Sequence, residues 1–415
     1  MENGLFKKDF ILVVIGQIIS LFGNAAIRFA LPLYLLNQTG SSALYGTVTA
    51  CAFIPAILLS PIGGIIADRI NKRNIMVILD FLTAIVILSF SILMDKTGLV
   101  VLAAITMMVL YGIAGTYQPS VQASVPALVS HDNIMAANSV INTISSFSSL
   151  TGPVLGGILY SAYGLKPVLY VCTACFFVSA VMEIFIKIPY KKQVNEGNIF
   201  HIAREDLSKG ILFIRKDQPV IGKVLVIICG VNLFLSAMII TGLPYLVTEV
   251  FELGALQANK MYGYAEGALA AGGLAGGIFA GIFANKLSVK KAGILLACCA
   301  ISVFPIGISL ILQFPGIISY IVTVICCFII MVLSTVFTIQ MLSFVQSETP
   351  QDLIGKVTAV ILAGSMCSQP LGNALYGVFF EICKGYEFVV IFFAAFASLV
   401  VAVSSKNIFK SLYMA

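Results

Sequence analysis

The long apolar stretches of this sequence contain a few side chains that can carry charge: Arg28, Asp80, Glu183 and Glu266. A charge among apolar helices is costly to keep, so such residues mark places where protons or charged groups bind. An acid in apolar surroundings favours its protonated form, whereas a nearby arginine favours the ionised form. We therefore predict that Glu266 binds and releases a proton, and that Arg28 is its counter-charge or binds an anionic group. The alternative for Glu266 is an acid that reaches the outer water.

The other two acids have basic neighbours in the sequence. Asp80 follows Arg73 by about two helical turns, roughly 10 Å along a helix axis. It is expected to bond Arg69 or Arg73 as part of a gate, or else to serve only in helix packing. Glu183 precedes Lys187 by one turn, so it is expected to pair with this lysine or to reach the membrane surface.

A charged loop follows the second apolar stretch, with the pattern Gly64-x-x-x-Asp68-Arg69-x-x-Lys72-Arg73. Gly64 permits two helices to approach closely, and Asp68 can accept hydrogen bonds from the N-terminus of a neighbouring helix. The basic side chains can hold carboxylates or lipid phosphates. A plain basic loop at a membrane surface is the alternative interpretation.

Polar side chains within the apolar stretches form a second set of candidates. Each of them either lines a cavity or makes a hydrogen bond between two helices, and the sequence leaves both readings open. These cavity candidates are Gln17, Asn24, Gln118, Gln122, Asn138, Asn142, Asn232, Gln340 and Gln369.

Patterns typical of enzymes and of metal sites are missing from the sequence. His131 and His201 lie in predicted loops, while the C-x-x-C pair Cys172 and Cys175 lies inside an apolar stretch, so no metal site is expected. No H-E-x-x-H, G-x-S-x-G or G-x-x-x-x-G-K-[ST] pattern occurs. We expect neither an enzyme nor an ATP-driven pump, and no cofactor. The scattered basic residues do not form the cluster that a nucleic-acid partner requires.

Composition indicates which elements position these residues. The 415 residues are 60% hydrophobic and only 10% charged, against roughly 25% charged in soluble domains. Lipid must therefore surround most of the molecule, and a spanning helix needs about 20 apolar residues. We predict an all-α membrane protein with twelve spanning helices, at residues 10–36, 44–67, 75–94, 99–127, 135–163, 165–188, 221–248, 262–285, 289–312, 315–345, 353–380 and 386–404.

The basic residues predict the orientation of these helices, because cytoplasmic loops carry an excess of Lys and Arg. With the N-terminus inside, nearly all of them fall on the inner loops, and the outer loops hold only Lys96, Lys166, Lys260 and Lys384. We therefore expect both termini to face the cytoplasm.

The two halves of the sequence repeat each other. Gly64-Ile65-Ile66-Ala67-Asp68-Arg69 recurs as Gly281-Ile282-Phe283-Ala284-Asn285-Lys286, and Pro153 and Pro370 are separated by the same interval. Leu31-Pro32 likewise matches Leu243-Pro244. This pattern predicts two pseudo-symmetric six-helix bundles, at 1–188 and 221–415. The stretch 189–220 between them reads as a cytoplasmic linker with an interfacial helix, and its alternatives are a solvated connector or a regulatory docking site.

With these residues in view, the sequence resembles the major facilitator superfamily. The loop from Gly64 to Arg73 is similar to the superfamily signature G-x-x-x-D-R-x-G-R-R, with Asn71 in place of a glycine. The antiporter-like motif Gly152, Pro153, Gly156 and Gly157 resembles that of drug exporters, although Ser148 replaces an earlier glycine of that motif. A closer resemblance to the macrolide-efflux and enterobactin-exporter branch rests on Gly16-Gln17-x-x-Ser20-x-x-Gly23, Ala30-Leu31-Pro32, Thr39-Gly40-Ser41, Leu353-x-Gly355-Lys356 and Pro370-Leu371-Gly372.

The resemblance implies a proton-coupled exporter of hydrophobic or amphipathic small molecules that works by alternating access, as a monomer in a bacterial cell membrane. It also implies that Gly64, Asp68, Arg69, Lys72 and Arg73, with Asp80, form a cytoplasmic gate. Asn24 stands where many relatives carry an acid, which leaves Glu266 as the expected proton carrier. The alternatives are a siderophore exporter, an uptake carrier of the same fold, and a membrane receptor or scaffold that does not transport.

Overall fold

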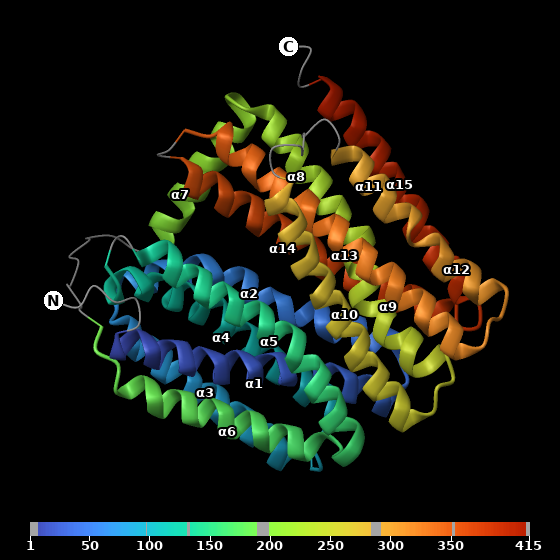
Figure 1. Cartoon of the computed structure of the whole chain (residues 1–415), viewed down its shortest axis with the longest axis horizontal. Coiled ribbons are helices and arrows are strands. Elements are labelled where there is room, and N and C mark those ends of the chain that lie inside the picture. Colours follow the sequence, from blue (N-terminus) through green and yellow to red (C-terminus); the bar gives the residue numbers. More distant parts are fainter. Residues whose placement is uncertain are drawn as a thin grey trace. The chain divides into compact units, whose positions relative to one another are not determined.

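The computed structural model describes residues 7–96, 98–130, 133–188, 199–283, 292–350 and 353–411. Throughout these ranges the regular elements are helices, joined by short turns (Figure 1). A helix satisfies its own backbone donors and acceptors, which is what long apolar segments require in lipid. The predicted all-α class is confirmed.

The first six helices follow the predicted segments within a few residues. They are α1 (Lys8–Thr39), α2 (Ser42–Arg69), α3 (Lys72–Leu93), α4 (Leu99–Leu128), α5 (Ile134–Tyr163) and α6 (Leu165–Ile184). A further helix, α7 (Ile199–Lys216), forms in the predicted linker, whose residues 189–198 lie outside the described part of the chain.

The later helices follow the second half of the pattern with two local changes. The seventh predicted segment is a continuous run interrupted by two π-helical turns, and the ninth breaks near Val303, before Pro305 in α12. The elements are α8 (Pro219–Val231), η2 (Asn232–Ser236), α9 (Ala237–Tyr245), η3 (Leu246–Val250), α10 (Ala255–Ile282), α11 (Ala292–Ile301), α12 (Phe304–Ile311), α13 (Gly316–Ser347), α14 (Ile354–Ile382) and α15 (Glu387–Ser411).

Ten helical spans in the described chain are long and apolar enough to cross a membrane. The other two predicted segments, α5 and α14, are helical and long but more polar: α5 is rich in Ser, Thr and Asn, and α14 contains Lys356, Gln369, Asn373 and Glu381. These two helices hold equivalent places in the sequence repeat. The more polar composition is therefore a property of the repeated unit.

The chain divides into two compact units. Unit 1 comprises Met1–Gln38 and Cys51–Ala203, and unit 2 comprises Thr39–Ala50 and Arg204–Ala415. The first turns of α2 thus belong to unit 2, because they pack against α14: a Cβ on Gly377 would lie 2.7 Å from the carbonyl oxygen of Ser42 and 3.0 Å from Gly46 Cα. The sequence limits 1–188 and 221–415 place this segment in the first half.

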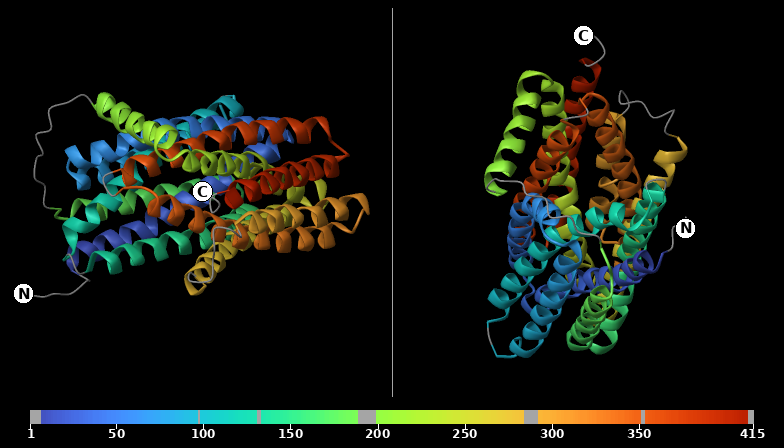
Figure 2. Two further views of the ribbon diagram at one scale, coloured as in Figure 1. Left: turned by 90° about the horizontal axis from the view of Figure 1, so that it is seen from above. Right: turned by 90° about the vertical axis from the view of Figure 1, so that its left-hand side faces the viewer.

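Within unit 1, α3 contacts both α4 and α6, and α5 contacts α4 and α6. Gly23 brings α1 against α6, where its Cβ would meet Cys175 at 3.1 Å. Within unit 2, α10 lies along α13 and α11 lies along α15 (Figure 2). Gly272 and Gly276 allow the α10–α13 contact, since a Cβ on Gly272 would lie 2.7 Å from the Phe328 carbonyl oxygen. The glycine spacing therefore serves helix packing, as small residues do between membrane helices.

Candidate functional site

Four helices of unit 1 bring polar side chains to one buried place. Gln17 Nε2 donates to the hydroxyl of Tyr117 at 2.7 Å, and this hydroxyl donates to Glu183 Oε1 at 2.8 Å. Ser20 Oγ donates to Asp80 Oδ1 at 3.2 Å. We call these five residues, from α1, α3, α4 and α6, the buried carboxyl cluster.

The cluster is closed to solvent. Asp80 is 2% exposed, and Gln17 and Glu183 are both 0% exposed. The expectation that Glu183 reaches the surface was wrong: α1 and α4 cover its carboxyl group and Tyr117 holds it. The backbone N–H of Lys187 donates to Asp9 at 3.0 Å, and Lys187 itself is exposed.

Local sequence explains why the helices meet here. Gln17 and Ser20 are one turn apart on α1, so they share a face. Gly16 lies beside them, and Ser179 Oγ of α6 donates to the Gly16 carbonyl oxygen at 3.2 Å. A Cβ on Gly16 would make an ordinary contact with that hydroxyl, at 3.5 Å. Tyr117, whose hydroxyl links Gln17 to Glu183, was not singled out by the sequence, although a tyrosine in the middle of an apolar helix usually needs a partner for its hydroxyl.

Arg28 lies closer to the C-terminal end of α1, about two turns beyond Ser20 of the cluster. Its guanidinium carbon sits 4.0 Å from the centre of the Tyr111 ring on α4, in a cation–π arrangement. Arg28 is partly exposed, and its Nε has no hydrogen-bond partner within the described residues.

Glu266 lies on α10 in unit 2. The Tyr262 hydroxyl, one turn earlier, donates to Glu266 Oε1 at 3.0 Å, and the side chain is partly buried. Glu266 and Arg28 belong to different units, so their predicted pairing stays a prediction.

Pro244 lies inside α9 of the same unit. Pro244 lacks an N–H, which frees the carbonyl of Ile240 one turn earlier. Tyr45, on the part of α2 that belongs to unit 2, donates its hydroxyl to this carbonyl at 3.3 Å.

The loop motif is described only in part. Gly64, Asp68 and Arg69 lie in the last turns of α2, and their side chains are outside the described residues. Asn71, the residue that departs from the family pattern, caps α3 and accepts from the backbone N–H of Arg73 at 3.0 Å. The Arg73 guanidinium donates to Asn74 Oδ1 at 3.0 and 3.2 Å, and Lys72 is partly buried. In this structure Asp80 bonds Ser20, and the gate role of these residues remains a prediction.

The antiporter-like motif makes a tight contact inside unit 1. Gly152, Pro153, Gly156 and Gly157 are all buried. A Cβ added to Gly152 would overlap that of Ala25, and one on Gly156 would lie 3.5 Å from Ala26 Cα. The motif therefore lets α5 lie directly on α1.

Some of the cavity candidates are hydrogen-bonded in the structure, and others are exposed or buried without a hydrogen-bond partner among the described residues. In unit 2, Asn232 Nδ2 donates to the Ser365 carbonyl oxygen at 3.0 Å, and Gln369 Nε2 donates to Asn373 Oδ1 at 3.1 Å. Gln340 is 7% exposed and neither of its amide atoms has a partner within the described residues. Gln122 and Asn142 of unit 1 are exposed, whereas three others of unit 1 are partly exposed: Asn24, Gln118 and Asn138.

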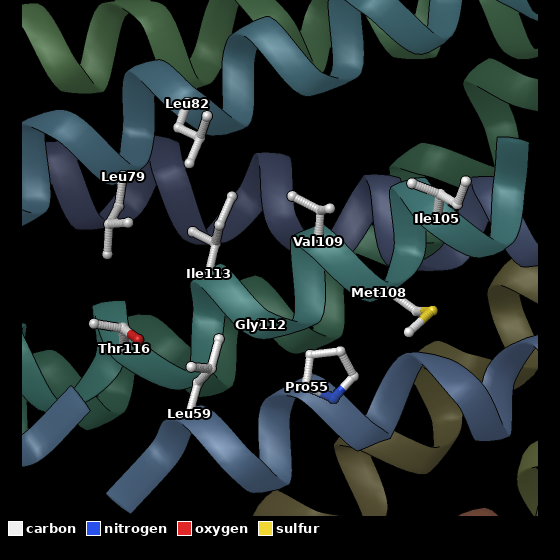
Figure 3. Close-up of a pocket in the computed structure, with 10 residues that line it drawn as sticks. All are labelled: Pro55, Leu59, Leu79, Leu82, Ile105, Met108, Val109, Gly112, Ile113 and Thr116. Atoms are coloured by element: carbon white, nitrogen blue, oxygen red, sulfur yellow. The ribbon is translucent and has the colours of Figure 1, made fainter. Parts of the chain in front are cut away.

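Unit 1 also has an apolar pocket of about 520 Å³ between α2, α3 and α4 (Figure 3). Leu59, Leu82 and Ile105 line it and are 37%, 40% and 55% exposed. Thr116 supplies the polar atom at one end. Such a pocket suits a hydrocarbon chain. Among the described residues, no group of three or more His, Cys, Asp or Glu side chains is placed to hold a metal ion.

These features define a class of protein: an all-helical membrane protein with polar and charged side chains buried among its spans. The family model of the Major Facilitator Superfamily matches residues 13–375. The chain belongs to this superfamily of membrane transporters, and it is embedded in a membrane and acts on a small-molecule substrate.

Two of the similar proteins are named for macrolide efflux or for multidrug resistance. Macrolide efflux protein A of Streptococcus pyogenes is 22% identical over 381 residues, 90% of each chain. The multidrug resistance protein MdtG of Salmonella arizonae is 27% identical over 203 residues, 48% of this chain and 49% of that one. The uncharacterised transporter YfiS of Bacillus subtilis is 26% identical over 220 residues, and this match spans about half of each chain, 52%.

Solved structures share the fold. A mutant of the nucleoside transporter NupG superposes with a TM-score of 0.78 at 14% identity, over 96% of this chain and 99% of that one. A bacterial homologue of the iron transporter ferroportin gives 0.71 at 15% identity, over 96% and 98% of the two chains.

Proposed function

We propose that the protein is a secondary active exporter of hydrophobic or amphipathic small molecules, driven by a proton gradient. The observation that carries this proposal is the match to macrolide efflux protein A, which covers 90% of both chains. The apolar pocket between α2, α3 and α4 supports a hydrophobic cargo. The buried acids Asp80 and Glu183 support proton coupling, because a proton can neutralise a buried carboxylate.

In this proposal Glu266 takes the coupling proton, and Arg28 is its counter-charge or holds an anionic group of the substrate. Asp68, Arg69 and Arg73 hold the cytoplasmic side closed when the transporter faces outward. Both termini lie in the cytoplasm of a bacterial cell, and the monomer is the working form. Alternating access is the mechanism that transporters built from two such repeats use.

The test is accumulation of a radiolabelled macrolide such as erythromycin in cells that overexpress the protein, with and without a protonophore. Export predicts lower accumulation than in cells without the protein, and the protonophore restores it. Higher accumulation would show an uptake carrier, and no effect over a panel of macrolides and lipophilic drugs would contradict the proposed cargo.

Glu266→Gln tests the coupling residue in proteoliposomes with an imposed pH gradient. We expect loss of gradient-driven transport, because the amide cannot exchange a proton. Glu249→Gln is the matched control: it removes an exposed acid of the same unit and should leave transport unchanged. Unchanged gradient-driven transport in Glu266→Gln would exclude Glu266 as the carrier.

A further inference from the structure

The buried carboxyl cluster of unit 1 has fewer hydrogen-bond donors than acceptors. Three of its oxygen atoms have no partner within the described residues: Gln17 Oε1, Asp80 Oδ2 and Glu183 Oε2. The Tyr117 hydroxyl has one hydrogen, which goes to Glu183, so Gln17 must present its NH₂ group to Tyr117. The free atom of Gln17 is therefore an acceptor, and all three unpartnered atoms need a positive or donating partner.

Among the described residues, the cluster has no counter-charge. Besides the two acids, Tyr117 of α4 is the one titratable side chain shown to face it in the described part of the chain, while α1 contributes Gln17 and Ser20 and α6 contributes Ser179. In the part of the chain whose side chains are described, no Lys, Arg or His forms an ion pair with Asp80 or Glu183. Arg28 is on the same helix as Ser20 but about 12 Å further along its axis, over the Tyr111 ring.

Two buried carboxylates without a cation would be very unfavourable. Each charge loses its hydration, and the two charges repel each other across a medium of low polarity. Buried unpaired carboxyl groups usually resolve this by taking up a proton. A proton on Asp80 Oδ2 or Glu183 Oε2 removes a charge and turns an unpartnered acceptor into a donor.

We infer that Asp80 and Glu183 form a proton-binding pair inside unit 1, with Gln17, Ser20 and Tyr117 as its hydrogen-bonding partners. The pair binds and releases protons without any other bond being made or broken. We assign the pair to protons and not to a metal ion, because among the described residues no third acidic, His or Cys side chain joins Asp80 and Glu183 to hold one. The use of these protons to drive export depends on the proposed function, but the binding itself does not.

Infrared spectroscopy of the purified full-length protein in nanodiscs tests the pair, because protonated carboxyl groups have a C=O stretch separate from that of carboxylates. The band is recorded as the pH is titrated through neutrality, in H₂O and in D₂O, since exchange of the carboxyl proton for deuterium shifts it. We expect the wild type to show protonated carboxyl at neutral pH. Asp80→Asn and Glu183→Gln should each lose part of this band, and the double variant should lose both parts. A wild type without the band, or a double variant that keeps it in full, would overturn the inference.

Three controls make the result specific. Asp95→Asn removes an acid of the same unit that is 59% exposed and bonded to Lys166 at 2.6 Å, so the band should persist. Tyr117→Phe alters the cluster but keeps both carboxyls, so it too should retain the band, and thermal unfolding identifies any variant that fails to fold. A titration in sodium chloride is compared with one in choline chloride, to distinguish proton binding from sodium binding. A band that sodium abolishes would show a cation site in place of the proton pair.

The outcome is separable from that of the proposed function. If export does not depend on the proton gradient but the protonated-carboxyl band is present, Asp80 and Glu183 bind protons that do not drive transport. Gradient-driven export together with an absent band would overturn the pair and leave the exporter.

Discussion

Gly152 of α5 faces Ala25 of α1 so closely that a Cβ on the glycine would overlap the Cβ of the alanine. Unit 2 repeats this relationship, because Gly372 of α14 faces Ala237 of α9 in the same way. Ala25 and Ala237 precede Leu31-Pro32 and Leu243-Pro244 by the same number of residues. Each half therefore has a contact between an alanine of its first helix and a glycine of its fifth, although Gly152 precedes Pro153 whereas Gly372 follows Pro370.

The contact predicts a rescue experiment. Gly152→Ala should destabilise the protein by about 1–3 kcal/mol, as overpacking does, and should lower its thermal unfolding temperature in detergent. Ala25→Gly should recover most of this loss in the double variant, because it removes the atom that overlaps.

Two other glycines serve as controls for that experiment. Gly277→Ala meets nothing within 4 Å and should be neutral or stabilising. Gly372→Ala should not be rescued by Ala237→Gly, since the Leu233 carbonyl oxygen would remain 2.6 Å from the new Cβ. A double variant Gly152→Ala, Ala25→Gly that is no more stable than Gly152→Ala alone would show that the overlap of Gly152 with Ala25 does not limit the stability of the protein.

The spanning helices could be predicted from the sequence because the length of an apolar run is a local property. The place of a side chain around its helix relative to other helices is not local, and here the predictions differ from the structure. Glu183 has a lysine one turn away and so looks like a surface acid, but Gln17 and Tyr117, distant in sequence, enclose it.

The assignment of Thr39–Ala50 to unit 2 has a similar cause. Nothing near Gly46 in the sequence indicates that this turn packs on Gly377. The role of Asn71 was predictable in principle, because asparagine is a preferred helix cap and α3 begins at the next residue.

Glu381 caps the start of α2 from another helix. Its Oε2 accepts from Ser41 Oγ at 3.0 Å, from Ser42 Oγ at 3.3 Å and from the Ala43 backbone N–H at 3.4 Å. Glu381→Ala should therefore loosen the first turn of α2, at a cost on the order of 1 kcal/mol as for other lost caps. Hydrogen exchange of the amides of residues 43–46 should become faster.

Glu387→Ala is the control for that measurement, because Glu387 accepts from the Gly385 N–H at 2.8 Å, and among the described residues its carboxylate has no hydrogen bond to α2. Exchange at residues 43–46 that is unchanged in Glu381→Ala would mean that the packing of Gly46 on α14 holds the turn without the cap.

The pair of Arg28 and Tyr111 predicts a measurable coupling. A double-mutant cycle with Arg28→Gln and Tyr111→Leu should give an interaction energy of about 0.5–2 kcal/mol in thermal or chemical unfolding, the range for cation–π contacts. Tyr111→Phe should retain most of it, because the ring remains. A coupling near zero would mean that Arg28 is held by solvent or lipid and not by the ring.

The apolar pocket of unit 1 predicts contact with lipid, and the sequence offers a clean probe because it has no tryptophan. Leu82→Trp places a single fluorophore at the pocket, at a side chain that is 40% exposed. In vesicles with brominated acyl chains its emission should be strongly quenched, since a hydrocarbon chain can enter a pocket of about 520 Å³. Phe90→Trp is the matched control on the same helix: Phe90 is 1% exposed, so quenching should be weak. Equal, weak quenching at both positions would show that the chains do not reach the pocket, and relief of quenching at Leu82→Trp by a macrolide would show that lipid and cargo compete for it.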